Sequence, residues 1–206
     1  MCSRLFLLSF IFLLITYFPS VSQVNNCDLK KDKDGIRVYT CPSDISKFRS
    51  LLAEFTIENT SFEDLQKFLW NVDNYVNWQY NMVEASLLQK TDNQSIIYRS
   101  VVDAPWPVQN REMIVQLSFR KTEKTDQLFF TMQSVATDYP LSDDLVRVPY
   151  SQASWTVKRV NTTLAVTYQL NIDPGGYVPP MLVNLAMAEG PYESFRKLKK
   201  LLEKKN

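Results

Sequence analysis

The sequence predicts an α+β fold in which a curved antiparallel sheet wraps around one long C-terminal helix. Successive segments between residues 49 and 173 read as strands, several of them with strict alternation of apolar and polar side chains. The last segment, 178–205, keeps apolar residues at helical spacing over about six turns. A sheet with one apolar face has to bury that face against another layer, and this helix is long enough to provide it.

The first 22 residues have the pattern of a secretory signal peptide. A basic start precedes the apolar run at 5–18, and a proline followed by small residues favours cleavage before Gln23. The apolar run is short for a membrane span, and an uncleaved signal anchor is the alternative. We therefore expect residues 1–22 to be a signal peptide and residues 23–206 to be one domain. The protein is expected to be exported, to a periplasm or out of the cell.

Two cysteines, Cys27 and Cys41, remain after such a cleavage. Residues 34–41 read as a strand, and residues 27–32 can pair with it through a short turn. An even number of cysteines in an exported chain favours a disulfide, which this hairpin would allow. Two unpaired thiols near the N-terminus are the alternative.

A strand and a helix follow the hairpin. Residues 49–60 alternate apolar and polar side chains, as in a half-buried strand. Thr60 or Ser61 then caps a helix expected at 61–78, with acidic residues in its first turn. Its apolar side chains at helical spacing are Phe62, Leu65, Phe68, Leu69, Val72, Tyr75 and Trp78. Such a stripe predicts packing against the core.

Further strands complete the sheet. Their expected ranges are 82–91, 94–103, 111–122, 126–136, 146–160 and 163–173. Within 113–120 and 164–172, apolar and polar residues alternate strictly. This period of two predicts an antiparallel sheet with one dry face and one face in water.

The interior between sheet and helix is predicted to hold a cavity. Wide side chains occupy the dry face, namely Tyr98, Met113, Phe130, Met132, Trp155 and Tyr168. The covering helix contributes the small residues Ala186 and Ala188, where a filled core would favour leucine. Large side chains on the sheet and small side chains on the helix together predict an internal apolar site.

The loop at 102–113 is unusual for a connection between two strands. It places Trp106 between Pro105 and Pro107, whereas an ordinary turn needs only glycine, asparagine or aspartate. Two prolines stiffen the chain and hold the indole in a fixed position. This arrangement is typical of an apolar flap over a binding site.

Composition excludes several classes of function. The chain has no histidine, which removes the commonest general base, the commonest metal ligand and every catalytic pair built on histidine. With only four glycines it lacks glycine-rich phosphate loops. Residues 1–22 contain one basic and no acidic residue, so their loss from 23 basic and 22 acidic residues leaves a neutral protein. Catalysis by Asp, Glu, Tyr or Lys is left open by composition, but the spacing favours no particular pair. We therefore expect no enzyme activity, no metal, no cofactor and no nucleic-acid partner.

Four stretches of the sequence resemble the steroidogenic acute regulatory protein-related lipid transfer family, the START domains, in particular its exported bacterial members. In chain order they read VDNYVNW, DAPWPVQNREM, VRVPYSQASW and NIDPGGYVPPMLVN, and the resemblance extends over residues 27–204. It implies a helix-grip fold, START/Bet v 1-like, that encloses a lipid-sized tunnel. Members bind or carry sterols, phospholipids, sphingolipids or other apolar molecules, and most are not enzymes. The resemblance also places the loop 103–110 at the tunnel mouth, with Trp106 as an apolar gate.

The resemblance also has a departure. Sterol-binding animal members carry an acidic residue and an arginine inside the tunnel, and Tyr98 and Leu117 stand at those positions here. Without that charged pair, a polar anchor has to come from Tyr98, Ser100 or Tyr168, and the tunnel is expected to be more uniformly apolar. The candidate ligand-binding residues are Tyr98, Ser100, Val102, Trp106, Met113, Val115, Leu117, Phe130, Trp155, Tyr168, Met181 and Leu185.

The leading functional hypothesis is non-catalytic binding or transfer of a lipid or other apolar small molecule, in a tunnel gated by the 103–110 loop. Transient contact with a membrane is left open. Arg111 is expected to be structural, bonding Asp103 or loop carbonyls, with contact to the ligand as the alternative. Two other functions remain as alternatives. One is a cyclase- or hydratase-like enzyme that acts on an aromatic polyketide and uses Tyr98, Asp103, Arg111 or Glu112, and the other is an interaction module with a filled interior.

Overall fold

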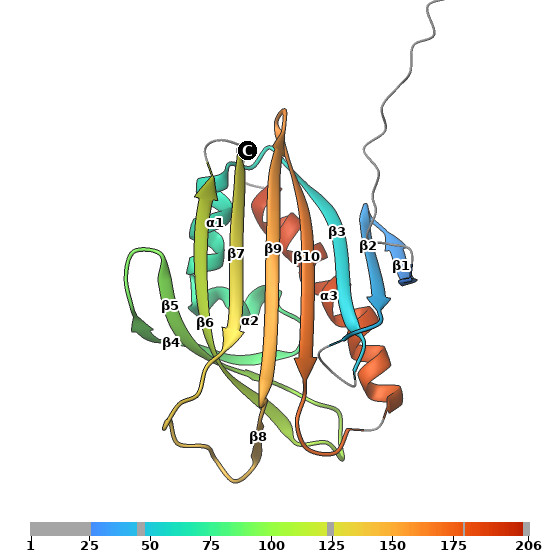
Figure 1. The fold of residues 1–206 in the computed structure, drawn as a ribbon, viewed down its shortest axis with the longest axis vertical. Helices are drawn as coiled ribbons and strands as arrows, with labels where there is room; N and C mark the ends of the chain where they lie inside the picture. Colours follow the sequence, from blue (N-terminus) through green and yellow to red (C-terminus); the bar gives the residue numbers. More distant parts are fainter. Residues whose placement is uncertain (1–25, 45–47, 123–125, 179, 204–206) are drawn as a thin grey trace, which may run out of the picture.

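The computed structural model describes residues 26–44, 48–122, 126–178 and 180–203. Ten strands form one sheet that curves around helix α3 (Figure 1). Along the sheet the strand order is β1-β2-β3-β10-β9-β7-β6-β5-β4, and β8 lies beside β6. The predicted α+β fold, a curved sheet around a long C-terminal helix, is confirmed.

The bounds of the elements follow the predicted ranges in most places. The strands are β1 (Asp28–Lys33), β2 (Ile36–Cys41), β3 (Ser50–Glu58), β4 (Met82–Lys90), β5 (Ser95–Val102), β6 (Asn110–Thr122), β7 (Gln127–Ser134), β8 (Leu145–Arg147), β9 (Tyr150–Val160) and β10 (Thr163–Asp173). The helices are α1 (Phe62–Trp70), the 3-10 turn η1 (Val72–Asn74), α2 (Tyr75–Trp78) and α3 (Pro180–Glu203). The helices lie on one face of the sheet, behind it in Figure 1.

β1 and β2 form the predicted hairpin at one edge of the sheet. Asp34 and Gly35 make its turn with φ values of 54° and 70°. Positive φ at both central residues is what a two-residue type I′ turn requires. The predicted disulfide between Cys27 and Cys41 closes the open end of the hairpin. A disulfide is in keeping with an oxidising location.

Replacing both Cys27 and Cys41 with serine is expected to lower the free energy of unfolding by about 3 kcal/mol. The bond joins residues that are 14 positions apart, so its loss releases a closed loop in the unfolded chain. Urea unfolding of the variant and the parent measures the difference, and a reductant added to the parent should reproduce it. Equal stability of the variant and the oxidised parent would contradict this account of the hairpin.

The hairpin also fixes the middle of α3. Lys31 forms an ion pair with Glu189, with Nζ 2.6 Å from Oε2, and its ammonium lies 4.4 Å from the centroid of the Tyr192 ring. The Tyr192 hydroxyl donates a hydrogen bond to Asp34 Oδ2 at 2.6 Å. These contacts tie the edge of the sheet to the helix that the sheet surrounds.

The single helix predicted at 61–78 is divided into three short elements. α1 begins after the cap residue Ser61, whose hydroxyl accepts a hydrogen bond from the Asp64 N–H at 3.0 Å. It ends at Asn71, where ψ is 79° and the backbone leaves the helix. Asparagine favours such ends because its side chain competes for backbone hydrogen bonds. The predicted stripe still lies in the core, and its buried members are Phe62, Leu65, Leu69, Val72, Tyr75 and Trp78.

The strand predicted at 146–160 is two strands. β8 ends at Arg147, shortly before Pro149, which has no N–H to donate to a strand ladder. β8 pairs in parallel with β6, so the sheet is not wholly antiparallel. On the outer face, where alternation predicts contact with water, Glu112 and Ile114 are buried, with exposures of 1% and 3%. The outer face is therefore covered near β8.

Beside α1 the interior is filled by side chains. Leu117 and Phe130, on the inner faces of β6 and β7, are fully buried. Phe119 makes an edge contact with Trp70 of α1, with ring centroids 5.2 Å apart, and a tilted contact with Phe130 at 6.4 Å. This part of the interior is an ordinary close-packed core.

Candidate functional site

A cavity of about 560 Å³ lies between the inner face of the sheet and the N-terminal half of α3. Its wall is formed by β3, β5, β6, β7, β9 and β10, by α2 and α3, and by loops that include those following β5 and β10. Both loops lie at the lower end of the sheet in Figure 1, near the start of α3. The volume falls within the range of sites for small molecules, roughly 300–1,000 Å³.

Half of the candidate ligand-binding residues line this cavity. They are Tyr98, Val102, Met113, Val115, Trp155 and Tyr168. These side chains come from two pairs of strands, β5 with β6 and β9 with β10, which are far apart in the sequence and which the sheet brings to one wall. Contact with a ligand remains a prediction for each of them.

The other candidates lie elsewhere. Three that are buried outside the cavity wall are Ser100, Leu117 and Phe130. Leu117 and Phe130 belong to the filled core beside α1, so their expected place on the tunnel wall is corrected. The side chains of Met181 and Leu185 lie outside the described residues. Trp106 is 92% exposed and does not line the cavity, contrary to its expected place in the ligand site.

Side chains of the loop after β5 point in two different directions. Ala104, Pro105 and Val108 line the cavity, whereas Trp106 points into solvent. The Val108 N–H donates to the Pro105 carbonyl at 3.0 Å, which closes a tight turn, and the Trp106–Pro107 peptide is cis. The loop therefore adds to the wall with Pro105 and Val108 and presents its indole outward.

Sequence reasoning did not assign several wall residues to the site. They include Leu51, Trp78, Ala153, Val183 and Phe195. A usable signal existed at Ala153, a small residue that shares the inward face of β9 with Trp155. Trp78 and Phe195 belonged to helical stripes that predict core packing, and nothing in the spacing distinguishes a cavity wall from a core.

Aromatic rings form the closed end of the cavity. Trp155 lies 5.3 Å from Tyr168 and 5.4 Å from Phe195, and Tyr168 lies 5.1 Å from Phe195, all in edge-to-face contacts between ring centroids. Tyr98 makes a similar contact with Tyr75 of α2 at 5.3 Å. Such contacts hold the rings in place, so this end of the cavity is pre-formed.

Polar groups with unmet hydrogen bonds lie in and behind this wall. The indole N–H groups of Trp78 and Trp155 and the hydroxyl of Ser100 are buried and have no hydrogen-bond partner among the described residues. Burial raises the pKa of Tyr98, to which nearby Tyr168 adds, and burial also raises the pKa of Tyr168. Both phenols therefore stay neutral and can donate a hydrogen bond. Buried donors without a partner are costly, and Trp78 and Trp155 line the cavity, where a polar atom of a ligand would be an acceptor for their N–H groups.

Arg111 joins the loops at the rim of the cavity. Its Nη1 donates to the Gln109 carbonyl, and its Nη2 donates to the Gly175 carbonyl at 3.3 Å. Gly175 has a φ of 68°, and a Cβ there would lie 2.9 Å from Cδ of Pro149, so the close approach of this loop requires glycine. Among the described residues, Arg111 forms no ion pair with Asp103, and burial lowers the pKa of its guanidinium.

Glu112 is held on the opposite face of the sheet by two arginines. Arg99 Nε donates to Oε1 at 2.6 Å, and Arg147 Nε donates to Oε2 at 2.9 Å. Arg99 also pairs with Glu84 at 2.5 Å, and Arg147 donates to the Tyr139 carbonyl at 2.8 Å. The network joins β4, β5, β6 and β8. The Glu112 carboxylate therefore does not face the cavity, which removes one acid from the enzyme alternative.

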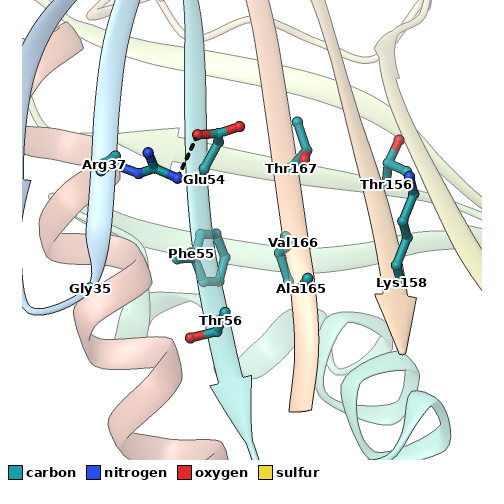
Figure 2. Close-up of a pocket in the computed structure, with 10 residues that line it drawn as sticks. All are labelled: Gly35, Arg37, Glu54, Phe55, Thr56, Thr156, Lys158, Ala165, Val166 and Thr167. Atoms are coloured by element: carbon teal, nitrogen blue, oxygen red, sulfur yellow. Dashed lines mark ion pairs between the residues drawn. The ribbon is translucent and has the colours of Figure 1, made fainter. Parts of the chain in front are cut away.

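A second hollow, of about 250 Å³, lies on the outer face of β2, β3, β9 and β10 (Figure 2). Arg37 and Glu54 form an ion pair at 3.0 Å beside it, and threonines and small residues supply much of its lining. It lies on the wetted face of the sheet, on the other side from the cavity. Phe55 is the one aromatic residue in its lining, whereas several aromatic residues line the cavity.

Other kinds of site are missing from the described part of the chain. Within those ranges, no group of three or more His, Cys, Asp or Glu residues is placed to hold a metal ion. No helix there is both long and apolar enough to cross a membrane. The predicted signal peptide, residues 1–22, lies outside the described residues and stays a prediction.

A family model for the START domain matches residues 29–206. The chain belongs to the START domain family. The fold agrees: a STAR-related lipid transfer protein from Xanthomonas axonopodis superposes with a TM-score of 0.78 at 26% identity, covering 86% of this chain and 99% of that one. Human STARD10 superposes with a TM-score of 0.74 at 20% identity, over 87% and 74% of the two chains.

Comparison of sequences also finds relatives of this protein. This START protein is 26% identical over 180 residues to an uncharacterized protein of Pseudomonas aeruginosa, covering 86% and 87% of the two chains. It is 23% identical over 165 residues to the human ceramide transfer protein, but that match covers only 26% of the longer relative. An aromatase/cyclase from Streptomyces shares the fold alone, with a TM-score of 0.51 at 10% identity.

Proposed function

We propose that this START protein binds a lipid in its internal cavity and carries it between membranes without catalysing a reaction. The observation that carries the proposal is the cavity of about 560 Å³, with its largely apolar wall beneath α3. Family membership supports it, as do relatives named for lipid transfer and ceramide transfer. The chain lacks histidine, and Glu112 faces away from the cavity, so an acid–base pair for catalysis is not evident there.

The apolar wall supplies affinity without specific chemistry. Each methylene taken out of water contributes about 0.8 kcal/mol, so a chain of ten yields about 8 kcal/mol before the cost of ordering it. Met113 and Val115 on one side and Ala186 and Met187 on the other would contact such a chain. The same wall includes the loop after β5, so a movement of that loop would admit or release a lipid, and this is the gating role we assign to residues 103–110.

Two exposed aromatic residues lie on the loops that form the rim. Trp106, 92% exposed, is on the loop after β5, and Tyr177, 84% exposed, is on the loop after β10. Arg111 bonds both loops, through Gln109 and Gly175. Tryptophan and tyrosine favour the boundary between lipid and water, since each has an apolar body and a polar atom. We infer that this rim is the surface that contacts a membrane during loading and unloading.

Trp106→Ala is expected to weaken binding to lipid vesicles about tenfold, because it removes an apolar side chain that would enter the bilayer. The free energy of unfolding should change by less than about 0.5 kcal/mol, since the side chain is in solvent. Vesicle co-sedimentation and urea unfolding measure the two quantities, and Tyr177→Ala should behave alike. Val160→Ala, at a 54% exposed residue at the end of β9, is the control. Unchanged vesicle binding by both rim variants would refute the membrane contact.

Transfer itself is tested with two vesicle populations. Donor vesicles carry a fluorescent lipid together with a quencher, and acceptor vesicles carry neither. The protein is expected to raise the rate at which fluorescence appears, in proportion to its concentration. A rate equal to that without protein, for single-chain, two-chain and sterol probes alike, would contradict the carrier function.

We also propose that transfer takes place outside the cytoplasm. The disulfide between Cys27 and Cys41 supports an oxidising location, and the pattern in residues 1–22 supports export with cleavage before Gln23. Expression of the full chain in a bacterium, followed by fractionation and mass measurement, tests this. Cytoplasmic protein that retains residues 1–22 and free thiols would contradict it.

A further inference from the structure

Arg111 is a buried cation for which the described residues supply no negative partner. Its side chain lines the cavity at the rim, and the residue is 9% exposed. None of the ion pairs among the described residues includes Arg111. Its guanidinium donates hydrogen bonds to two neutral carbonyls, those of Gln109 and Gly175. Asp103 is the one carboxylate among the described residues of the cavity wall, and it is exposed and forms no ion pair with Arg111.

Two other arginines near this part of the sheet, Arg99 and Arg147, have acidic partners. Arg99 and Arg147 both bond the Glu112 carboxylate, and Arg99 bonds Glu84 as well. For Arg99, burial lowers the pKa, but hydrogen bonds with Glu84 and Glu112 outweigh this effect and raise it. For Arg111, burial lowers the pKa and no acidic neighbour opposes the change. A buried charge without a counter-charge is costly, so this one calls for an explanation.

The geometry leaves the guanidinium available to a ligand. Its bonds to Gln109 and Gly175 use two of the five N–H groups and fix the side chain between two rim loops. A guanidinium offers paired donors that match the two oxygens of a carboxylate or phosphate. Arg111 pairs with Val102 across the sheet, whereas Val115, four residues further along β6, pairs with Tyr98 of the inner wall. The cavity thus runs inward from Arg111 along β6 for about 13 Å.

We propose that Arg111 binds the anionic head group of the lipid, a carboxylate or a phosphate, while the acyl chain fills the cavity behind it. The inference rests on the proposed function and adds the chemical class of its ligand. The bound acid supplies the missing negative charge at the rim, and the chain extends from Arg111 toward the aromatic rings at the closed end. Neutral lipids with the same chain would fill the cavity but leave the charge unmatched.

Three ligands with one chain test this: hexadecanoic acid, hexadecyl phosphate and hexadecanol. Each displaces a neutral fluorescent probe from the full-length folded protein, and the displacement gives its Kd. The parent is expected to bind at least one acid about tenfold or more tightly than the alcohol, as charge-assisted hydrogen bonds predict. Which acid binds better distinguishes a carboxylate ligand from a phosphate ligand. Arg111→Gln should abolish this preference while keeping affinity for the alcohol, and Arg111→Lys should restore part of it.

Arg120→Gln is the control, since Arg120 lies on the same strand but is exposed and away from the cavity. It removes the same charge and should leave the preference unchanged. Equal affinity of the parent for acids and alcohol would overturn the inference and leave the carrier function standing. Equal weakening of all three ligands in Arg111→Gln would show that Arg111 only ties the loops together, and this too would overturn it. No binding of any ligand by the parent would overturn the carrier function itself. The parent comparison does not depend on whether the variants fold.

Discussion

Ala153→Phe is expected to weaken lipid binding about 100-fold while changing the free energy of unfolding by less than about 1 kcal/mol. Ala153 is on the inner face of β9 and lines the cavity, so the added ring would grow into space that we assign to the ligand. Displacing three or four methylenes of lipid at about 0.8 kcal/mol each gives the expected loss. Titration with a fluorescent lipid and urea unfolding measure the two quantities.

Leu117→Trp is the matched contrast to this substitution. Leu117 also lies on the inner face of the sheet, but it is fully buried in the core beside α1. Overpacking a filled core costs about 1–3 kcal/mol, and lipid affinity should change little if the fold survives. Ala153→Phe with unchanged affinity, or with a loss of stability as large as that of Leu117→Trp, would contradict the assigned ligand space.

Glu112→Ala is expected to lower the free energy of unfolding by about 3–5 kcal/mol. The carboxylate is 1% exposed and bonds both Arg99 and Arg147, so its removal leaves two positive charges close together without their partner. It also releases β8 from β6, which the ion pair with Arg147 helps to join. Chemical denaturation measures the loss.

Glu54→Ala provides the control for this prediction. Glu54 pairs with Arg37 on the outer face, where the two side chains are 23% and 53% exposed. Exposed ion pairs contribute little, so this variant should lose less than about 1 kcal/mol. A loss of similar size in Glu112→Ala would mean that the buried network is not a main support of β8.

The parts of the fold that depend on local pattern could be predicted from the sequence. Strict alternation at 113–120 and 164–172 identified two strands and the side chains on their inward faces. Helical spacing identified α3, and the cysteine pair identified the hairpin with its disulfide. These features depend on neighbours within a few residues, or on a period that the sequence itself displays.

The extent of the cavity could not be predicted in the same way. Leu117 and Met132 are register partners on the inner face, yet only Met132 lines the cavity. Alternation tells which face a side chain is on, but not whether α1 or empty space lies opposite. That depends on where α1 packs, which is set by contacts between distant parts of the chain. Ser100 and Phe130 were assigned to the ligand site for the same reason.

Two other features depend on long-range geometry. Arg147 reaches Glu112 from 35 residues away, through a short parallel strand that no periodicity indicates. The proline-flanked loop lies beside the cavity, but the sequence did not reveal that Trp106 faces solvent while Pro105 and Val108 line the cavity. Backbone conformation within the loop decides that direction, and the residue types alone do not.

Native mass spectrometry of the purified full-length protein would show directly whether the cavity holds a lipid. After incubation with a total lipid extract, the account predicts one bound lipid per chain. The added mass should be lost in Ala153→Phe and retained in Val160→Ala. Dissociation of the complex in the gas phase would give the mass of the lipid, and an acidic lipid is expected. A parent protein that shows no added mass, or that binds lipid equally well when Ala153 is replaced by phenylalanine, would contradict a lipid carrier built around this cavity.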